Sequence, residues 1–187
     1  YGCGSLTNIE IPNGVTSIGE YAFYGCGSLT NIEIPNGVTT IGKSAFYNCY
    51  KLESVIFSQN SQLINIGDSV FFNCVSLTSI KIPNGVTNIG NSAFSYCSDL
   101  TSIMISDSVT SIGRSAFCGC SNLTKIVIPD SVTSIGDSAF SSCSKLTNIT
   151  LGENVTYIGN GAFSRCDSVI FKNPQNWYVV VQENVVA

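Results

Sequence analysis

Residues 77–97 read Leu-Thr-Ser-Ile-Lys-Ile-Pro-Asn-Gly-Val-Thr-Asn-Ile-Gly-Asn-Ser-Ala-Phe-Ser-Tyr-Cys, and this pattern returns along most of the 187-residue chain. Its cysteine recurs every 23 residues, with a single interval of 25, at Cys3, Cys26, Cys49, Cys74, Cys97, Cys120, Cys143 and Cys166. A fixed period of this length predicts a solenoid, in which each repeat forms one coil that buries its apolar face against its neighbours. We therefore expect a mainly β, right-handed, single-domain solenoid of about eight 23-residue coils.

The first half of each repeat predicts a strand followed by a turn. Ile9 and Ile11 alternate with Glu10, as a strand with one buried face requires. Pro12-Asn13-Gly14 then provides the residue types that favour a chain reversal. Since corresponding residues of successive coils stack, these segments should form a column of parallel strands. Neighbouring strands in the column should lie about 4.8 Å apart.

The second half predicts a shorter extended segment and a compact corner. Residues 15–18 are β-branched and apolar at both ends, and Gly19 follows them. We expect this glycine to supply a backbone angle that a β-branched residue could not adopt. The segment Ser-Ala-Phe-x-x-Cys is then short enough for one helical or 3₁₀ turn. Each coil should point a leucine, three isoleucines, a valine, an alanine, a phenylalanine and a cysteine inward.

The array has an irregular third repeat and a divergent end. We assign residues 1–166 to seven full repeats, the third carrying two extra residues within 57–63. This insertion is either tolerated drift at a corner or a protrusion that marks one edge of a ligand site. After Cys166 the pattern decays, with Lys172 where an isoleucine is expected, so residues 167–187 are interpreted as a degenerate repeat that caps the solenoid.

Composition excludes several classes of function. Only 11% of residues are charged, the net charge is −4, and eight Lys plus Arg offer no footprint for nucleic acid or anionic lipid. No stretch approaches the roughly 20 apolar residues of a membrane-spanning helix, so we expect no membrane insertion. The sequence starts within a repeat and lacks an initiator methionine, so we expect it to be part of a longer protein.

The nine cysteines do not have the spacing of a metal site, and the chain contains no histidine. We expect the eight cysteines of the repeat to be buried free thiols and Cys118, which is out of register, to be the accessible one. Some pairing within the column remains an alternative, since its spacing lies inside the disulfide range. Neither a catalytic site nor a cofactor site is predicted, because no histidine is present to activate a nucleophile.

The phrase L-T-x-I-x-I-P-x-x-V-T-x-I-G-x-x-A-F-x-x-C closely resembles the BspA-like (Treponema pallidum type) leucine-rich repeat, over roughly Cys3 to Cys166. The resemblance implies a leucine-rich-repeat solenoid in a secreted or cell-surface, and hence extracellular, protein. It also implies adhesion to host extracellular-matrix proteins or to other microbial surfaces. A structural stalk or spacer within a larger surface protein is the alternative.

Candidate ligand-binding residues lie in the columns whose identity varies from repeat to repeat. The outward column of the first strand contains Ile56, Lys81, Met104 and Val127, and a second column, two places before each cysteine, begins with the aromatic residues Tyr24, Tyr47 and Phe72. The first set is either a protein-binding patch or ordinary strand propensity. The second is either a recognition surface or a ladder of rings that stabilises stacked coils.

Overall fold

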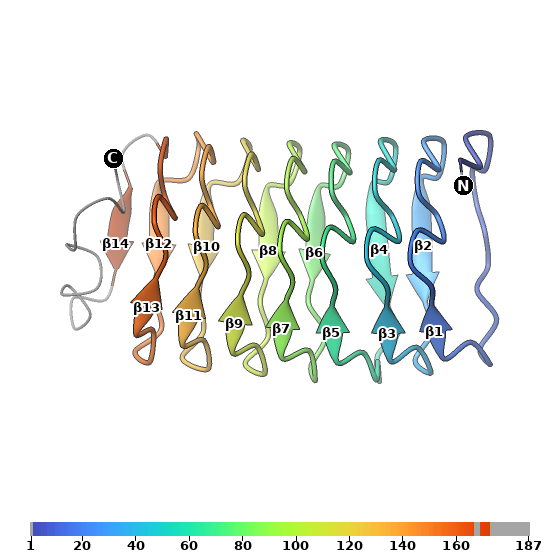
Figure 1. The fold of residues 1–187 in the computed structure, drawn as a ribbon, viewed down its shortest axis with the longest axis horizontal. Helices are drawn as coiled ribbons and strands as arrows, with labels where there is room; N and C mark the ends of the chain where they lie inside the picture. The colour runs from blue at the N-terminus through green and yellow to red at the C-terminus, as the bar shows by residue number, and fades with distance from the viewer. Residues whose placement is uncertain (1, 167–168, 173–187) are drawn as a thin grey trace.

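The computed structural model describes residues 2–166 and 169–172, which form a solenoid with two columns of parallel strands (Figure 1). The first column comprises β2 (Asn31–Ile34), β4 (Ser54–Phe57), β6 (Ser79–Lys81), β8 (Ser102–Met104), β10 (Lys125–Val127), β12 (Asn148–Thr150) and β14 (Ile170–Lys172). The second comprises β1 (Ser17–Ile18), β3 (Thr40–Ile41), β5 (Asn65–Ile66), β7 (Asn88–Ile89), β9 (Ser111–Ile112), β11 (Ser134–Ile135) and β13 (Tyr157–Ile158). The predicted mainly β solenoid with parallel strand columns is confirmed.

The two columns differ in continuity. The second is one seven-stranded sheet, whereas the first is divided into β2-β4, β6-β8 and β10-β12-β14. Every pairing is parallel and joins residues one repeat apart, so that Glu33 lies beside Ile56 and Lys81 beside Met104. Strand ladders are therefore absent, within the described residues, between β4 and β6 and between β8 and β10.

Within the described residues, six coils contain both strands, against the eight coils expected. The first coil has only β1, because no coil covers its outer side, and the eighth is represented by β14. The register of β14 also corrects one prediction. Phe171, not Lys172, pairs with Ile149, so this last interval is 22 residues. The rest of the proposed cap at 167–187 lies outside the described residues.

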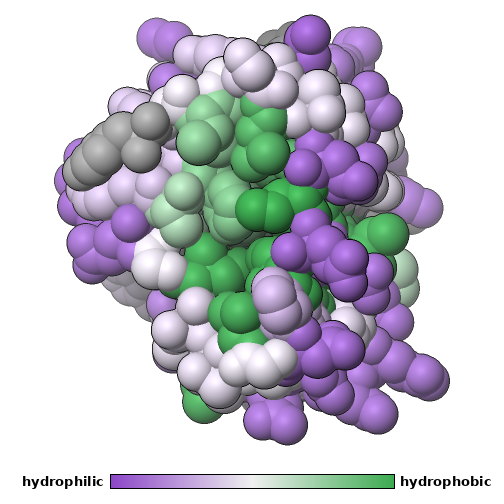
Figure 2. All heavy atoms as spheres, turned by 90° about the vertical axis from the view of Figure 1, so that its right-hand side faces the viewer, coloured by the Kyte–Doolittle hydropathy of each residue, from purple (hydrophilic) through white to green (hydrophobic). Residues whose placement is uncertain are grey.

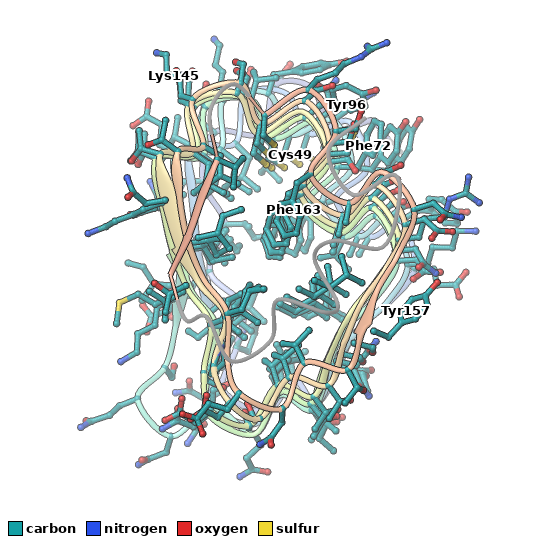
Figure 3. The ribbon with its side chains drawn as sticks, turned by 90° about the vertical axis from the view of Figure 1, so that its left-hand side faces the viewer. Cys49, Phe72, Tyr96, Lys145, Tyr157 and Phe163 are labelled. Atoms are coloured by element: carbon teal, nitrogen blue, oxygen red, sulfur yellow. The ribbon has the colours of Figure 1, made fainter. Side chains whose placement is uncertain are left out.

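The core consists of columns of like residues, as predicted. In the fourth coil all eight inward side chains are buried: Leu77, Ile80, Ile82, Val86, Ile89, Ala93, Phe94 and Cys97. Adjacent phenylalanine rings stack face to face, with centroids 5.3 Å apart for Phe71 and Phe94 and 5.2 Å apart for Phe94 and Phe117. Phe163 and Cys49 lie inside the coil cross-section (Figure 3). Burial of these columns drives the fold, because each methylene removed from water contributes about 0.8 kcal/mol of stabilisation.

The corner before each cysteine is a series of turns and not the helical or 3₁₀ turn expected. Alternate N–H groups bond locally, as from Ala45 to the Gly42 carbonyl (3.2 Å). The intervening ones bond to the next coil, as from Phe46 to the Val70 carbonyl (2.9 Å). Ser44 has a φ of 55°, which breaks any continuous helical backbone. Carbonyl groups of the neighbouring coil thus accept hydrogen bonds from backbone N–H groups that a helix would use within its own turn.

The glycine after the second strand has a different role from the one predicted. The residues with positive φ include Ser44 at the corner, while Gly42 and Gly113 are not among them. A Cβ on Gly113 would instead lie 2.7 Å from the Asn91 nitrogen of the preceding coil. Glycine is required there by the close approach of two coils, not by its own backbone angle.

Both ends of a solenoid interrupt the stacking, and the N-terminal end shows the consequence. Viewed along the axis, apolar residues fill the middle of this end (Figure 2). Ile9, Ile11, Val15 and Phe23 are only partly buried, whereas their counterparts one coil later are buried. The first coil therefore lacks, among the described residues, the neighbour that covers the inner residues of the next coil.

Candidate functional site: the outward face of the first strand column

The outward face of the first strand column presents apolar side chains to solvent. The alternation of each strand turns Ile56, Met104 and Val127 away from the core, and these side chains are 57%, 63% and 58% exposed. Lys81, between Ile56 and Met104 along the column, is also exposed. All four residues predicted for this face lie on its surface, which makes them accessible to a partner.

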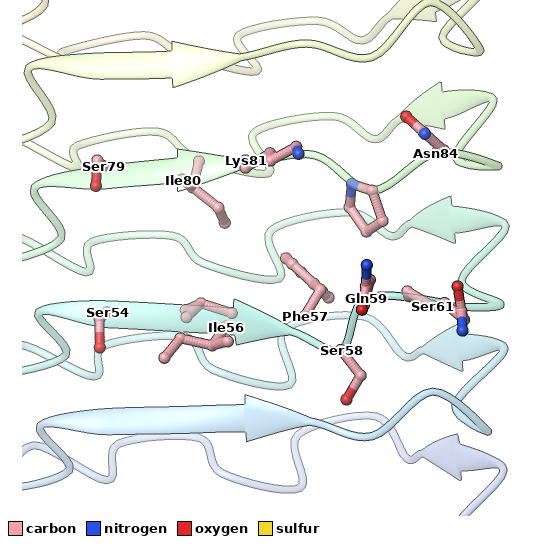
Figure 4. A pocket seen from close by; sticks show the side chains of 13 residues that line it. Ser54, Ile56, Phe57, Ser58, Gln59, Ser61, Ser79, Ile80, Lys81 and Asn84 are labelled. Atoms are coloured by element: carbon pink, nitrogen blue, oxygen red, sulfur yellow. The ribbon is translucent and has the colours of Figure 1, made fainter.

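The insertion in the third coil opens a groove on this face. The Ser58 and Gln62 backbone N–H groups donate to the carbonyls of Ile34 and Asn36, each at 3.1 Å, so the loop is tied back to the second coil. On its other side no ladder joins β4 to β6, the two strands that flank the groove. The resulting groove has a volume of about 640 Å³ (Figure 4).

The lining of the groove combines apolar, polar and cationic groups. Its wall on the third coil includes Ile56, Phe57, Gln59 and Ser61, and its wall on the fourth includes Ser79, Ile80, Lys81, Pro83 and Asn84. Such a mixture suits an extended polypeptide, which presents amides and side chains together. The structure thus brings Ile56 and Lys81 together in one groove, while Met104 and Val127 lie on coils beyond it.

Sequence reasoning missed part of this site. The repeat pattern does not distinguish the amide and hydroxyl groups of Gln59, Ser61 and Asn84, although they line the groove. The available signal was the interval of 25 residues between Cys49 and Cys74, which locates the insertion. The insertion borders this groove, and its interpretation as one edge of a ligand site stays a prediction.

The aromatic column forms a stacked ladder. The rings of Tyr24 and Tyr47 are 5.0 Å apart and 10° from parallel, and those of Tyr47 and Phe72 are 4.5 Å apart and 6° from parallel. The faces between neighbouring rings are therefore occupied, so the inner ring, Tyr47, presents its edge to a partner. Burial is the main cause that raises the pKa of Tyr47. This geometry favours the structural interpretation of the column.

The two candidate sets lie on different sides of the coil. In the view along the axis, Phe72 and Tyr96 lie across the coil from β14 and the other strands of the first column (Figure 3). The ladder ends where Phe72 meets Tyr96 edge to face, with centroids 5.4 Å apart. One ligand of modest size could not contact both surfaces, so each can be tested separately.

The thiols follow the predicted pattern with one correction. All nine cysteines are free, and seven are buried, but Cys3 is exposed and Cys118 is half-buried. Cys3 was expected to be buried, yet it belongs to the first coil, whose outer side is uncovered. Six of the seven buried thiols donate to a phenylalanine carbonyl, as from Cys97 Sγ to the Phe71 oxygen at 3.2 Å. Burial raises the pKa of Cys97 to about 12.

Two further structural features bear on function. Within residues 2–166 and 169–172, no group of three or more Cys, Asp or Glu side chains is arranged to hold a metal ion. In the same part of the chain, no helix combines the length and the apolar character needed to cross a bilayer.

Comparison with known proteins identifies bacterial repeat proteins whose solved structures are similar to this chain. A leucine-rich repeat protein of Treponema pallidum shares 32% identity with a TM-score of 0.77, over 83% of this chain and 72% of that one. A leucine-rich repeat protein of Bacteroides ovatus shares 33% identity with a TM-score of 0.63 over 82% of this chain. The match spans only 45% of the Bacteroides ovatus protein. A leucine rich cell surface protein of Faecalibacterium prausnitzii shares 29% identity with a TM-score of 0.65, over 92% of this chain and 56% of that one.

These similarities agree with the repeat pattern itself. No curated protein sequence is significantly similar to this chain. The family model for the BspA type leucine rich repeat region, however, matches residues 1–65 and 64–183, nearly the whole sequence. The chain therefore belongs to the BspA-type leucine-rich repeat family.

Proposed function

We propose that this chain is a non-enzymatic, extracellular or cell-surface module that binds proteins through the outward face of its first strand column. The observation that carries the proposal is the groove between β4 and β6, where Ile56 and Lys81 meet the polar insertion loop. A patch of exposed apolar residues around such a groove is typical of protein interaction sites. Met104 and Val127 extend the apolar surface along the same face.

The class of partner is inferred from the family and from the chemistry of the face. One relative is described as a cell surface protein, which supports an extracellular setting for this chain. The first strand column presents Asn, Ser and Thr between its apolar residues, a composition that suits main-chain and side-chain hydrogen bonding to a protein. Host extracellular-matrix proteins or the surfaces of other microbes are the proposed partners.

Two matched variants test the location of binding. Replacing Ile56, Met104 and Val127 with threonine imitates Thr150, which already occupies this column. Replacing Tyr24, Tyr47 and Phe72 with serine imitates Ser95, Ser141 and Ser164 in the aromatic column. Both substitution sets use residues that their columns already contain, so both variants should fold, which circular dichroism would verify.

The readout is capture of proteins from a solubilised extracellular-matrix extract, identified by mass spectrometry. We expect a specific protein to be captured by the unmodified chain and by the serine variant, and to be lost with the threonine variant. Loss with the serine variant alone would move recognition to the aromatic column. If every variant captures the same proteins as the unmodified chain, or none captures any, the structural stalk becomes the better interpretation.

A further inference from the structure

Opposite charges flank Ile56 on the outward face of the first strand column. Glu33 lies beside Ile56 in the pairing of β2 with β4, and Lys81 follows in the same column across the groove. Both charged side chains are exposed, and neither has an ion pair or a side-chain hydrogen bond with another described residue. The order along the solenoid axis is thus acidic, apolar, basic, with Glu33 one strand spacing of about 4.8 Å from Ile56 and Lys81 on the far side of the groove.

We propose that this face binds a second copy of the chain, in a two-fold dimer whose solenoid axes run in opposite directions. The inference rests on the proposed function of the face and names its partner. With the two-fold axis along β4, Ile56 meets Ile56 of the partner subunit. Glu33 then faces Lys81 of the partner subunit, and Lys81 faces Glu33 of the partner subunit. The symmetric interface therefore contains two pairs of opposite charges, each formed by Glu33 of one subunit and Lys81 of the other.

Neighbouring registers pair the charged and apolar side chains of this face less well. An axis through Lys81 would place that cation against its own copy, and an axis through Glu33 would do the same for the anion. An axis midway between β2 and β4 would pair Lys81 with Glu10 but would press Glu33 against Ile56. The register centred on Ile56 is the one among these that pairs Glu33 with Lys81 and Ile56 with its own copy, a basis for partner selection.

The adjacent residues on the strands are compatible with this register. With a two-fold axis parallel to the strands, each row of equivalent residues faces the same row of the partner subunit. Ser54 therefore meets its own copy, and Asn31 meets Ser79 of the partner subunit. These are uncharged pairs. Facing sheets pack about 10 Å apart, a gap that an extended glutamate and lysine can bridge together. The exposed Ile56 and Met104 supply the apolar area that becomes buried.

The expected dimer is weak and sensitive to salt. Exposed ion pairs each contribute little, and salt screens them. Replacing one partner by a like charge removes the attraction and adds repulsion at both symmetric positions. We therefore expect each single charge reversal to weaken dimerisation at least tenfold, which corresponds to about 1.4 kcal/mol.

Charge reversal and exchange provide the test. Sedimentation equilibrium of the unmodified chain, E33K, K81E and a one-to-one mixture of the two variants would be compared at low and physiological salt. The E33K variant alone sets lysine against lysine, and K81E alone sets glutamate against glutamate, but the mixture restores opposite charges at both contacts. We expect a reversible dimer for the unmodified chain, monomers for each variant, and a heterodimer in the mixture.

The control is E10K, which lies in the same column but faces Met104 of the partner subunit in this register. It should leave the dimer within about threefold of its original strength. A monomeric unmodified chain, a mixture that does not associate, or an E10K effect as large as that of E33K would each overturn the inference. Circular dichroism of each variant would establish that the fold is retained, as expected for exposed positions.

Failure of this inference is distinguishable from failure of the proposed function. A chain that stays monomeric, but loses a captured matrix protein when Ile56, Met104 and Val127 become threonine, binds another protein through this face. A chain that dimerises as described, but captures no protein from the extract, uses the face for self-association. Two solenoids aligned in opposite directions would in that case suit adhesion between two facing surfaces.

Discussion

Gly113→Ala tests whether glycine is needed for the close approach of two coils. A Cβ at this position would lie 2.7 Å from the Asn91 nitrogen and from the Gly90 carbonyl carbon, both backbone atoms that cannot rotate away. Ordinary contact begins at 3.4 Å, so the two coils would have to separate by about 0.7 Å. The Gly113 N–H donates to the Ile89 carbonyl at 2.8 Å, and such a separation would stretch that hydrogen bond out of its usual range.

The expected cost combines overpacking with a weakened hydrogen bond. Overpacking of a tight site costs about 1–3 kcal/mol, and we expect the free energy of unfolding to fall by that amount. Gly19→Ala is the matched control, because it occupies the same place in the repeat but has no atom within 4 Å of an added Cβ. It should be neutral or stabilising by up to about 1 kcal/mol, since alanine restricts the unfolded chain.

Urea denaturation followed by circular dichroism would measure both variants. A loss for Gly19→Ala as large as that for Gly113→Ala would refute the reasoning, because the cost would then reside in the local backbone conformation that both glycines share. A neutral Gly113→Ala would refute it as well, since the coils would then have room for the methyl group. Only a difference between the two positions supports a stacking requirement.

Three other predictions concern the core and its thiols. A thiol-labelling reagent applied to the native protein should modify Cys3 fast, Cys118 more slowly and the seven buried cysteines only on unfolding; fast reaction of any buried thiol would contradict this. Burial raises the pKa of Cys97 from 9.0 to about 12, so stability should be constant below pH 9 and fall as the pH rises toward 12, because only the unfolded chain loses the proton there; urea titrations across this range check it. Phe94→Ala removes a buried ring between two stacked neighbours and should cost about 3–5 kcal/mol in the same assay, a loss that Phe94→Leu should largely avoid.

The repeat pattern predicts the core well because each inward residue recurs at one place in every coil. Leu77, Ile80 and Phe94 can be assigned to the interior from periodicity alone, and the structure buries all three. Periodicity says less about the corners, where the partner of a backbone group lies in another coil. The turns around Ser44 and the tight contact at Gly113 depend on that neighbour, so a reading of one repeat at a time cannot supply them.

The candidate site was predictable only in part for a similar reason. Alternation identifies Ile56 and Lys81 as outward residues, and the longer interval before Cys74 identifies the insertion. It does not reveal that the loop bonds to the second coil, or that β4 and β6 have no ladder between them. The groove depends on these contacts between coils. The sequence of the third or the fourth repeat, taken alone, does not specify them.

A pair of identical segments within the chain isolates the effect of a neighbour. Residues 1–16 and 24–39 have the same sixteen-residue sequence. In the second copy, Asn31–Ile34 forms β2 with Ile32 and Ile34 buried, whereas the equivalent residues 8–11 form no strand, and Ile9 and Ile11 are only partly buried. Since local propensity is equal in the two copies, the difference arises from the coil that covers one and not the other. Strand formation in this repeat is therefore a property of stacked coils, and no method that reads one repeat alone could separate the two.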